Sequence, residues 1–185
     1  MSSRANTLVI VIALMWVVHF LRVVLPGSVV YGIIPRTAEG LAGIVMAPFL
    51  HMNLQHLWSN TIPLAILGAV VLLRGSNQFL SIFAMTALFS GFGTWIFGSR
   101  GMHIGASGVV FGLAGFLIFR GLFERTFAAL VIAIVIAVAY WQMILIGLVP
   151  QEGIGWAGHF FGFVGGAVAA RTHAGTRGLR RRSVM

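Results

Sequence analysis

Cysteine, lysine and aspartate are all absent from the 185-residue chain. Without cysteine the chain can form no disulfide and present no thiolate, which excludes thiol catalysis and cysteine-ligated metal centres. Acidic residues are almost as scarce, since only Glu39, Glu124 and Glu152 occur, each expected in a connection between helices. Proton relays and cation pathways through membranes are commonly built on intramembrane carboxylates. A function of that kind is therefore not expected.

Charge of either sign is rare in the chain. Only 8% of the residues are charged, whereas 59% are hydrophobic and 24 residues are glycine. Ordinary soluble domains carry about 25% charged and about 45–50% apolar residues. A globule of this size buries only part of its surface and could not hide so much apolar area. The composition excludes a soluble enzyme, a nucleic-acid-binding protein and a disordered protein, and it indicates an integral protein of the lipid bilayer.

Six apolar stretches are candidate membrane spans, because a helix needs about 20 apolar residues to cross about 30 Å of hydrocarbon. They cover approximately residues 7–25, 54–73, 79–97, 107–120, 126–148 and 156–171, and the fourth and sixth are short. The first span lacks an obvious small-residue cleavage site and is expected to be retained. The sequence predicts an all-α integral membrane protein, with residues 1–185 as one domain of six transmembrane helices and a basic tail over 172–185.

Arginine supplies all twelve basic residues, and the formal net charge is +9. If both ends of the chain are cytoplasmic, nine arginines lie on that side: Arg4, Arg74, Arg120, Arg125, Arg171, Arg177, Arg180, Arg181 and Arg182. Only Arg22, Arg36 and Arg100 then face outward. This imbalance obeys the positive-inside rule, and the terminal cluster is typical of an anchor against anionic lipid. We expect a multi-pass protein of the cell membrane with both termini inside.

Three polar side chains on different spans are predicted at one depth. Counted from the cytoplasmic arginines at about 1.5 Å per residue, Ser107 lies about 20 Å up, His159 about 18 Å and Asn60 about 21 Å. His56 shares a helix face with Asn60 through its i, i+4 spacing and lies about one turn higher. A nucleophile, candidate bases and hydrogen-bond donors are thus expected several Å below the outer face.

The residues before Ser107 predict a cavity that opens outward. A fourth span over 107–120 would cover only about 21 Å, so Ser107 begins its helix within the thickness of the membrane. Residues 98–106 must then descend as non-helical backbone, which is tolerated only where protein buries it or water lines it. We expect a water-filled depression with Ser107 at its floor.

Glycines at helical spacing accompany both Ser107 and His159. They are Gly108 and Gly112 on one span and Gly158, Gly162 and Gly166 on the other. Small residues at this spacing let membrane helices approach closely. Packing of the two spans face to face would bring Ser107 and His159 within hydrogen-bond distance.

Each polar residue also has a structural interpretation. Serine at a helix start is usually a cap, and His19 and His103 are most simply structural or loop-orienting residues. A haem or metal centre is an alternative, because His51, His56 and His159 could supply imidazoles. The chain has no HExxH motif and no carboxylate at their level, which argues against that alternative. We expect neither a metal nor a cofactor.

Three motifs together resemble the rhomboid intramembrane serine proteases. Residues 105–108 (GASG) are similar to the family's GxSG nucleophile motif. Residues 51–60 resemble the second-span motif, with His56 and Asn60 in its HxxxN positions, and Gly158, His159 and Gly162 resemble the sixth-span motif. Residues 32–36 and 47–51 also look like the first outer loop of some bacterial members. The resemblance covers nearly the whole chain and implies the simple six-span bacterial form.

The resemblance implies a Ser-His dyad with Ser107 as nucleophile and His159 as general base. It further implies that His56, Asn60 and the Ser107 backbone N–H form the oxyanion hole, with His51 supporting the loop. The family often has tyrosine four residues after the nucleophile, stacked on the catalytic histidine, whereas this chain has Phe111. We expect this change to keep the ring stacking and the activity.

The expected function is intramembrane serine endopeptidase, with single-pass transmembrane proteins as substrates and no nucleic-acid partner. One alternative is an inactive rhomboid-like protein that binds membrane clients without cutting them, although the intact Ser107 and His159 argue against it. The sequence predicts neither the substrate nor the oligomeric state.

Overall fold

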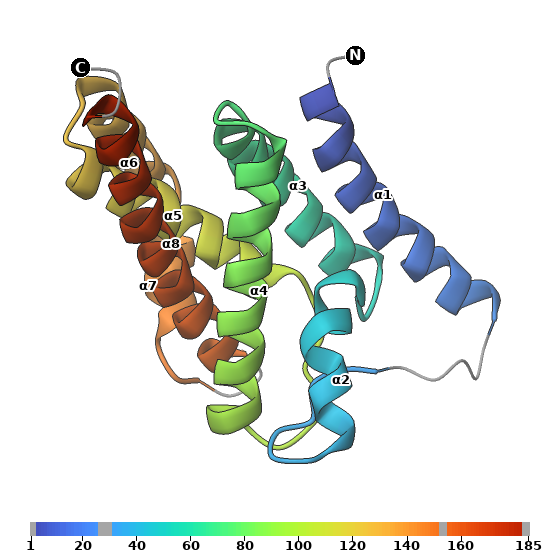
Figure 1. Cartoon of the computed structure of the whole chain (residues 1–185). Coiled ribbons are helices and arrows are strands. Elements are labelled where there is room, and N and C mark those ends of the chain that lie inside the picture. Colours follow the sequence, from blue (N-terminus) through green and yellow to red (C-terminus); the bar gives the residue numbers. More distant parts are fainter. Residues whose placement is uncertain (1–2, 26–30, 152–154, 183–185) are drawn as a thin grey trace.

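The computed structural model describes residues 3–25, 31–151 and 155–182 (Figure 1). The helices in these ranges are α1 (Ser3–Val24), α2 (Glu39–Met46), α3 (Leu54–Leu72), α4 (Ser76–Phe97), α5 (Ser107–Glu124), α6 (Phe127–Ala139), α7 (Trp141–Leu148) and α8 (Trp156–Arg182), with a 3-10 turn at Ala47–Phe49. The described ranges contain no named strand, and an isolated bridge pairs Ile33 with His103. The predicted all-α class is confirmed.

Four helices are long and apolar enough to cross a membrane: α1, α3, α4 and α5. Helices α6 and α7 together make a fifth candidate, although a 65° bend separates them. Helix α8 is not in this set, because its glycines, His159 and Arg171 lower its mean hydropathy. The fold is thus that of a multi-pass membrane protein, with four to five candidate spans by length and composition.

Two helices extend beyond the expected ends of their spans. Helix α5 continues past Arg120 to Glu124, where Arg125 adopts a left-handed conformation with φ 51° and ends the helix. Helix α8 continues past Arg171 to Arg182. Neither helix is short, because an arginine does not interrupt a helix in which every backbone hydrogen bond can still form.

The expected placement of the acidic residues in connections also needs correction. Glu39 is the first residue of α2, and Glu124 is the last residue of α5. Glu152 lies outside the described residues. The connection over residues 26–51 therefore includes a helix of its own, α2, which packs against α4.

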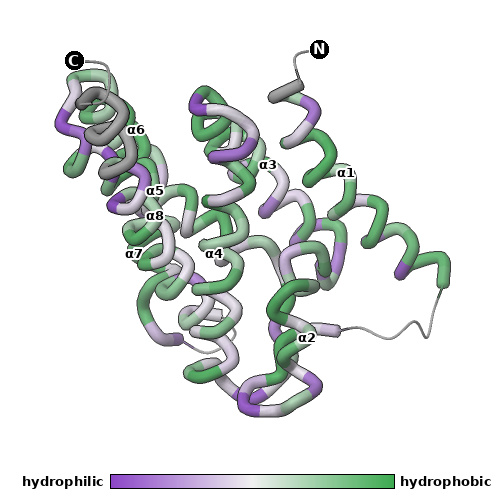
Figure 2. The backbone as a smooth tube through the Cα atoms, in the orientation of Figure 1, coloured by the Kyte–Doolittle hydropathy of each residue, from purple (hydrophilic) through white to green (hydrophobic). Residues whose placement is uncertain are grey.

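Helix α5 lies at the centre of the molecule, and eleven of its residues are buried. It packs most extensively against α8 and also contacts α3, α4 and α6. Figure 2 shows apolar residues along the middle of the helices and hydrophilic residues gathered mainly towards their ends. In Figure 1 the first turn of α1 and the last turn of α8 lie at the same end of the molecule. Helix α4 ends at the opposite end of the molecule, where its connection to α5 begins (Figure 1).

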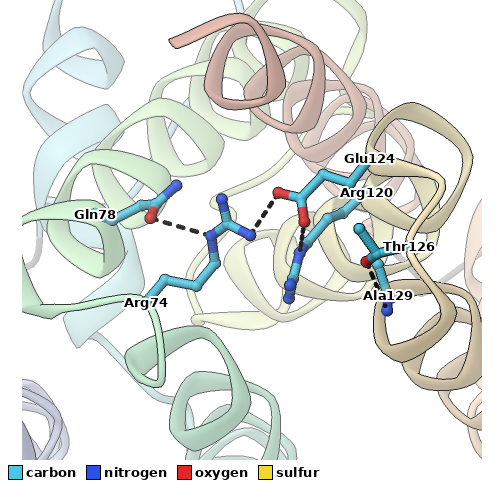
Figure 3. Close-up of polar contacts among 6 residues, drawn as sticks. All are labelled: Arg74, Gln78, Arg120, Glu124, Thr126 and Ala129. Carbon is cyan, nitrogen blue, oxygen red and sulfur yellow. Dashed lines mark hydrogen bonds and ion pairs between the residues drawn. The ribbon is translucent and has the colours of Figure 1, made fainter. Parts of the chain in front are cut away.

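A buried ion cluster ties the α3–α4 connection to the end of α5 (Figure 3). The Glu124 carboxylate pairs with Arg74 and also accepts from Arg120 at 2.9 Å, and Arg74 donates to Gln78 at 3.0 Å. The side chains of Arg74 and Glu124 are only 4% and 7% exposed. One carboxylate thus holds two guanidinium groups at the end of the bundle remote from Ser107.

Candidate active site

Ser107 is the first residue of α5, as expected. Residues 98–106 before it are non-helical, which confirms the predicted irregular backbone. Gly105 has a φ of 122°, a conformation that favours glycine, and its N–H donates to the Ala47 carbonyl at 2.8 Å. The loop before Ser107 is also paired with Ile33 through two backbone hydrogen bonds of His103 at 2.8 and 2.9 Å. Backbone contacts therefore fix where α5 begins.

His159 lies one turn into α8 and faces Ser107. Its Nε2 is 2.9 Å from the Ser107 Oγ, a normal hydrogen-bond distance. Its other ring nitrogen, Nδ1, lies 3.1 Å from the Gly147 carbonyl oxygen. The Phe111 ring stacks on the imidazole, with centroids 4.2 Å apart and planes inclined by 7°. The imidazole is therefore held on three sides, by Ser107, Gly147 and Phe111.

Glycines allow α5 and α8 to approach this closely. A Cβ atom added at Gly162 would lie 2.0 Å from the Gly108 carbonyl oxygen, and one added at Gly166 would lie 2.0 Å from the Gly112 carbonyl oxygen. One at Gly158 would instead meet the Thr94 hydroxyl of α4 at 2.7 Å. The glycine packing predicted between the two helices is confirmed, and α4 takes part in it as well.

His56 and Asn60 lie on successive turns at the start of α3. The Asn53 side chain caps the helix by accepting from the His56 N–H at 2.8 Å, and the Asn60 amide donates to the His56 carbonyl at 2.8 Å. The Met52 N–H lies 3.4 Å from the His56 Nδ1. Because a backbone N–H can only donate, this contact makes Nδ1 the acceptor and leaves the proton on Nε2.

The four side chains line one cavity. A pocket of about 520 Å³ is bordered by Ser107, His159, His56 and Asn60. Apolar side chains complete its wall, among them Met52, Met102, Ile104 and Met143. The structure therefore brings the predicted nucleophile, base and hydrogen-bond donors together around a space large enough for a peptide segment.

His51 is fully buried beside this cavity, and its ring contacts His56 with centroids 5.2 Å apart. Burial, together with the charge that His56 can carry, lowers the pKa of His51 to about 4. The Arg22 guanidinium of α1 donates to the His51 carbonyl at 3.0 Å. His51 thus lies at the end of the loop that precedes α3, in contact with the His56 ring.

Some residues around the site were missed by the sequence analysis. The sequence predicts Arg22 only as an outward-facing charge, whereas its guanidinium ties α1 to His51, in the loop before α3. The Gly147 carbonyl and the Ser90 and Thr94 side chains that pack against Gly108 and Gly158 were also missed. Ser90 and Thr94 could have been noticed as polar residues inside an apolar span. A contact through a backbone carbonyl cannot be recognised in a sequence, because every residue has one.

The remaining histidines have local roles in the structure. The His103 ring contacts the Ser99 carbonyl at 2.9 Å, and His19 is buried on α1, where its ring stacks edge-on with Phe20. Within the described ranges, no three histidine or glutamate side chains converge in a way that could hold a metal ion.

Comparison with known proteins agrees with this geometry. The family model of the rhomboid domain matches residues 38–175, three quarters of the chain. An uncharacterized protein of Mycobacterium bovis is 42% identical over 151 residues, covering 76% of this chain and 62% of the relative. One of Mycobacterium tuberculosis matches equally, and one of Mycobacterium leprae is 41% identical over 140 residues. The chain thus spans about three fifths of the length of these curated relatives. It belongs to the rhomboid family.

Proposed function

We propose that the protein is an intramembrane serine endopeptidase with Ser107 as nucleophile and His159 as general base. The observation that carries the proposal is the 2.9 Å contact between the Ser107 Oγ and the His159 Nε2 inside a cavity. Two groups within hydrogen-bond reach are what nucleophilic catalysis by serine requires. Rhomboid proteins are generally intramembrane serine proteases, which supports the same reaction.

In the proposed reaction the Ser107 Oγ attacks the scissile carbonyl carbon while its proton passes to the His159 Nε2. The tetrahedral intermediate collapses as His159 returns that proton to the leaving amine, so the C–N bond breaks and an acyl-enzyme remains. Water then attacks the ester with His159 again as base. Hydrolysis releases the acid product and restores the Ser107 hydroxyl.

The negative oxygen of each tetrahedral intermediate needs hydrogen-bond donors. His56 presents a protonated Nε2, because its Nδ1 accepts from the Met52 N–H. Asn60 uses one amide hydrogen on the His56 carbonyl and keeps a second. With the Ser107 backbone N–H at the open end of α5, these groups make up the proposed oxyanion hole. One such donor contributes about 10²–10³ in rate in other serine proteases.

We further propose six spans, counting α6 with α7 as one bent span and α8 as the last. The first turn of α1 and the last turn of α8 lie at one end of the molecule, as an even number of spans requires (Figure 1). The arginine distribution supports a cytoplasmic position for that end. The cavity then opens to the outer face, and a reporter fused after Arg182 should be cytoplasmic.

Single-pass membrane proteins are the proposed substrates. A transmembrane helix has its backbone carbonyls engaged in i→i−4 bonds, and freeing them in hydrocarbon costs several kcal/mol each. The polar groups that line the cavity, those of Ser107, His56 and Asn60, can hydrogen-bond such freed groups. We therefore expect cleavage in the outer part of the substrate span, near glycine, proline or other poor helix formers.

The decisive experiment is labelling of the purified protein with a serine-reactive fluorophosphonate. Wild type should be labelled, whereas Ser107→Ala and His159→Ala should not, although both remain folded in a thermal unfolding assay. The same variants should fail to cleave a model single-pass substrate in lipid vesicles. Labelling or cleavage by Ser107→Ala at a tenth of the wild-type rate contradicts the proposal.

A further inference from the structure

The outer half of the bent span contributes a backbone group to the site. Helix α7 carries Gly147, a buried residue whose carbonyl oxygen lies 3.1 Å from the His159 Nδ1. The 65° bend between α6 and α7 directs α7 towards α8. Among the described residues, this carbonyl is the only hydrogen-bond partner of Nδ1.

The chemistry of the two partners assigns the proton. A carbonyl oxygen can only accept, so the contact requires a hydrogen on Nδ1. A neutral imidazole carries one hydrogen, which leaves Nε2 with a lone pair directed at the Ser107 Oγ, 2.9 Å away. This is the tautomer that can take a proton from the serine. The opposite tautomer would place the Nδ1 lone pair against the carbonyl oxygen.

We propose that Gly147 is a positioning residue that selects the base-competent tautomer of His159. Its carbonyl takes the part that a carboxylate plays in a Ser-His-Asp triad, where the third member holds the imidazole in the correct tautomer. Neither acidic residue in the described ranges borders the cavity around Ser107. The tautomer assignment stands by itself, whereas its catalytic meaning rests on the proposed protease activity.

The close approach requires glycine at this position. A Cβ atom added to Gly147 would lie 2.1 Å from the Phe111 Cζ and 3.1 Å from the His159 Nδ1. The first distance is far below any real contact, so Phe111 or α7 must shift to admit even alanine. Gly147→Ala therefore perturbs the carbonyl contact while changing no group that donates or accepts protons.

Nitrogen-15 NMR of the full-length protein in lipid bilayers, with labelled histidine, reads the tautomer directly. The His159 signals are those missing from a His159→Gln sample. At a pH where His159 is neutral, we expect wild type to show a protonated Nδ1 and an unprotonated Nε2. Wild type with the proton on Nε2 would overturn the proposal without any variant.

Two variants separate the carbonyl from the rest of the surroundings of His159. Phe111→Leu removes the stacked ring but leaves Gly147 in place, so it should keep the Nδ1–H tautomer. Gly147→Ala should lose that tautomer in part or in full. Leu145→Ala is a matched control, because this side chain of α7 is 59% exposed and does not border the cavity. An unchanged tautomer in a folded Gly147→Ala protein also overturns the proposal.

Fluorophosphonate labelling supplies the functional readout. Gly147→Ala should be labelled at least about tenfold more slowly than wild type, since a wrong tautomer costs a triad protease far more than this. Leu145→Ala should stay close to the wild-type rate. Equal slowing in both variants would show a general effect of α7 and refute the specific role of Gly147. Absence of labelling in wild type would refute the protease activity but not the tautomer assignment.

Discussion

The contact between Gly162 and Gly108 sets how far Ser107 can be from His159. Gly162 follows His159 by one turn on α8, and Gly108 follows Ser107 on α5. A Cβ atom at position 162 would lie 2.0 Å from the Gly108 carbonyl oxygen, whereas ordinary contacts begin at 3.4 Å. Gly162→Ala must therefore push the two helices apart locally by up to the difference, about 1.4 Å.

That displacement is large compared with the tolerance of a hydrogen bond. Added in full to the present 2.9 Å, it would place the Ser107 Oγ about 4.3 Å from the His159 Nε2, which is no longer a hydrogen bond. Misplacement by about 1 Å can cost about 10² in rate. We expect labelling and substrate cleavage by Gly162→Ala to fall by about that factor.

The stability of the same variant should change little by comparison. Overpacking costs about 1–3 kcal/mol, and the gain of alanine over glycine in a helix offsets about 1 kcal/mol of this. Thermal unfolding in detergent, measured beside the labelling assay, separates the two effects. The expected result is a folded protein with an impaired site.

Gly68→Ala provides a matched control for this prediction. It adds the same methyl group to a membrane helix, but its nearest contact is the Leu8 Cδ1 at 2.8 Å, the tip of a flexible side chain. This variant should keep its activity. If folded Gly162→Ala retains more than half of the wild-type labelling rate, the packing of α5 on α8 does not control the dyad geometry.

Three further predictions concern other parts of the molecule. Glu124→Gln should lower the free energy of unfolding by about 1–3 kcal/mol, because it weakens the charge-assisted contacts with Arg74 and Arg120; Arg125→Gln, at an exposed position, should change little, and equal losses would contradict this. Burial lowers the pKa of His51 from 6.5 to about 4, so the unfolded state binds more protons in this range. The free energy of unfolding should therefore fall by up to about 3 kcal/mol as the pH drops from 6.5 to about 4. If His51→Ala shows the same change of unfolding free energy with pH as wild type, His51 is not the cause. Asn60→Ala and His56→Ala should each reduce cleavage by about 10²–10³ without preventing fluorophosphonate labelling, and complete loss of labelling would indicate a role beyond oxyanion binding.

Features with a local physical cause could be predicted from the sequence. The start of α5 at Ser107 follows from the irregular, glycine-containing residues before it. The start of α3 at Leu54 agrees with the expected start of the second span, and Asn53 before it is a favourable N-cap residue. The spacing of Gly108 and Gly112 against Gly162 and Gly166 predicted the helix pair that carries the site. The apolar composition predicted a multi-pass helical protein.

Features that depend on tertiary contacts could not be predicted in this way. Residues 127–148 are apolar apart from Gln142, and neither proline nor glycine marks the bend at Tyr140. The last turn of α5 depends on Glu124 pairing with Arg74 of a distant connection. The contacts of Arg22 with the His51 carbonyl and of His159 with the Gly147 carbonyl join a side chain to the backbone. Any residue type supplies such a carbonyl, so no sequence pattern identifies it.

The geometry around Ser107 is set largely by main-chain atoms. Contacts between the glycines of α8 and backbone carbonyls of α5 set the distance between the two helices. Backbone hydrogen bonds of Gly105 and His103 hold the loop before Ser107 in place. The cavity wall, in contrast, is made of side chains such as Met52, Met102 and Met143, which take no part in those contacts. Unbranched methionines are flexible and fill irregular spaces. The wall can therefore change by mutation without moving Ser107 or His159, so in the proposed protease the fit of the substrate can change while the reacting atoms keep their positions.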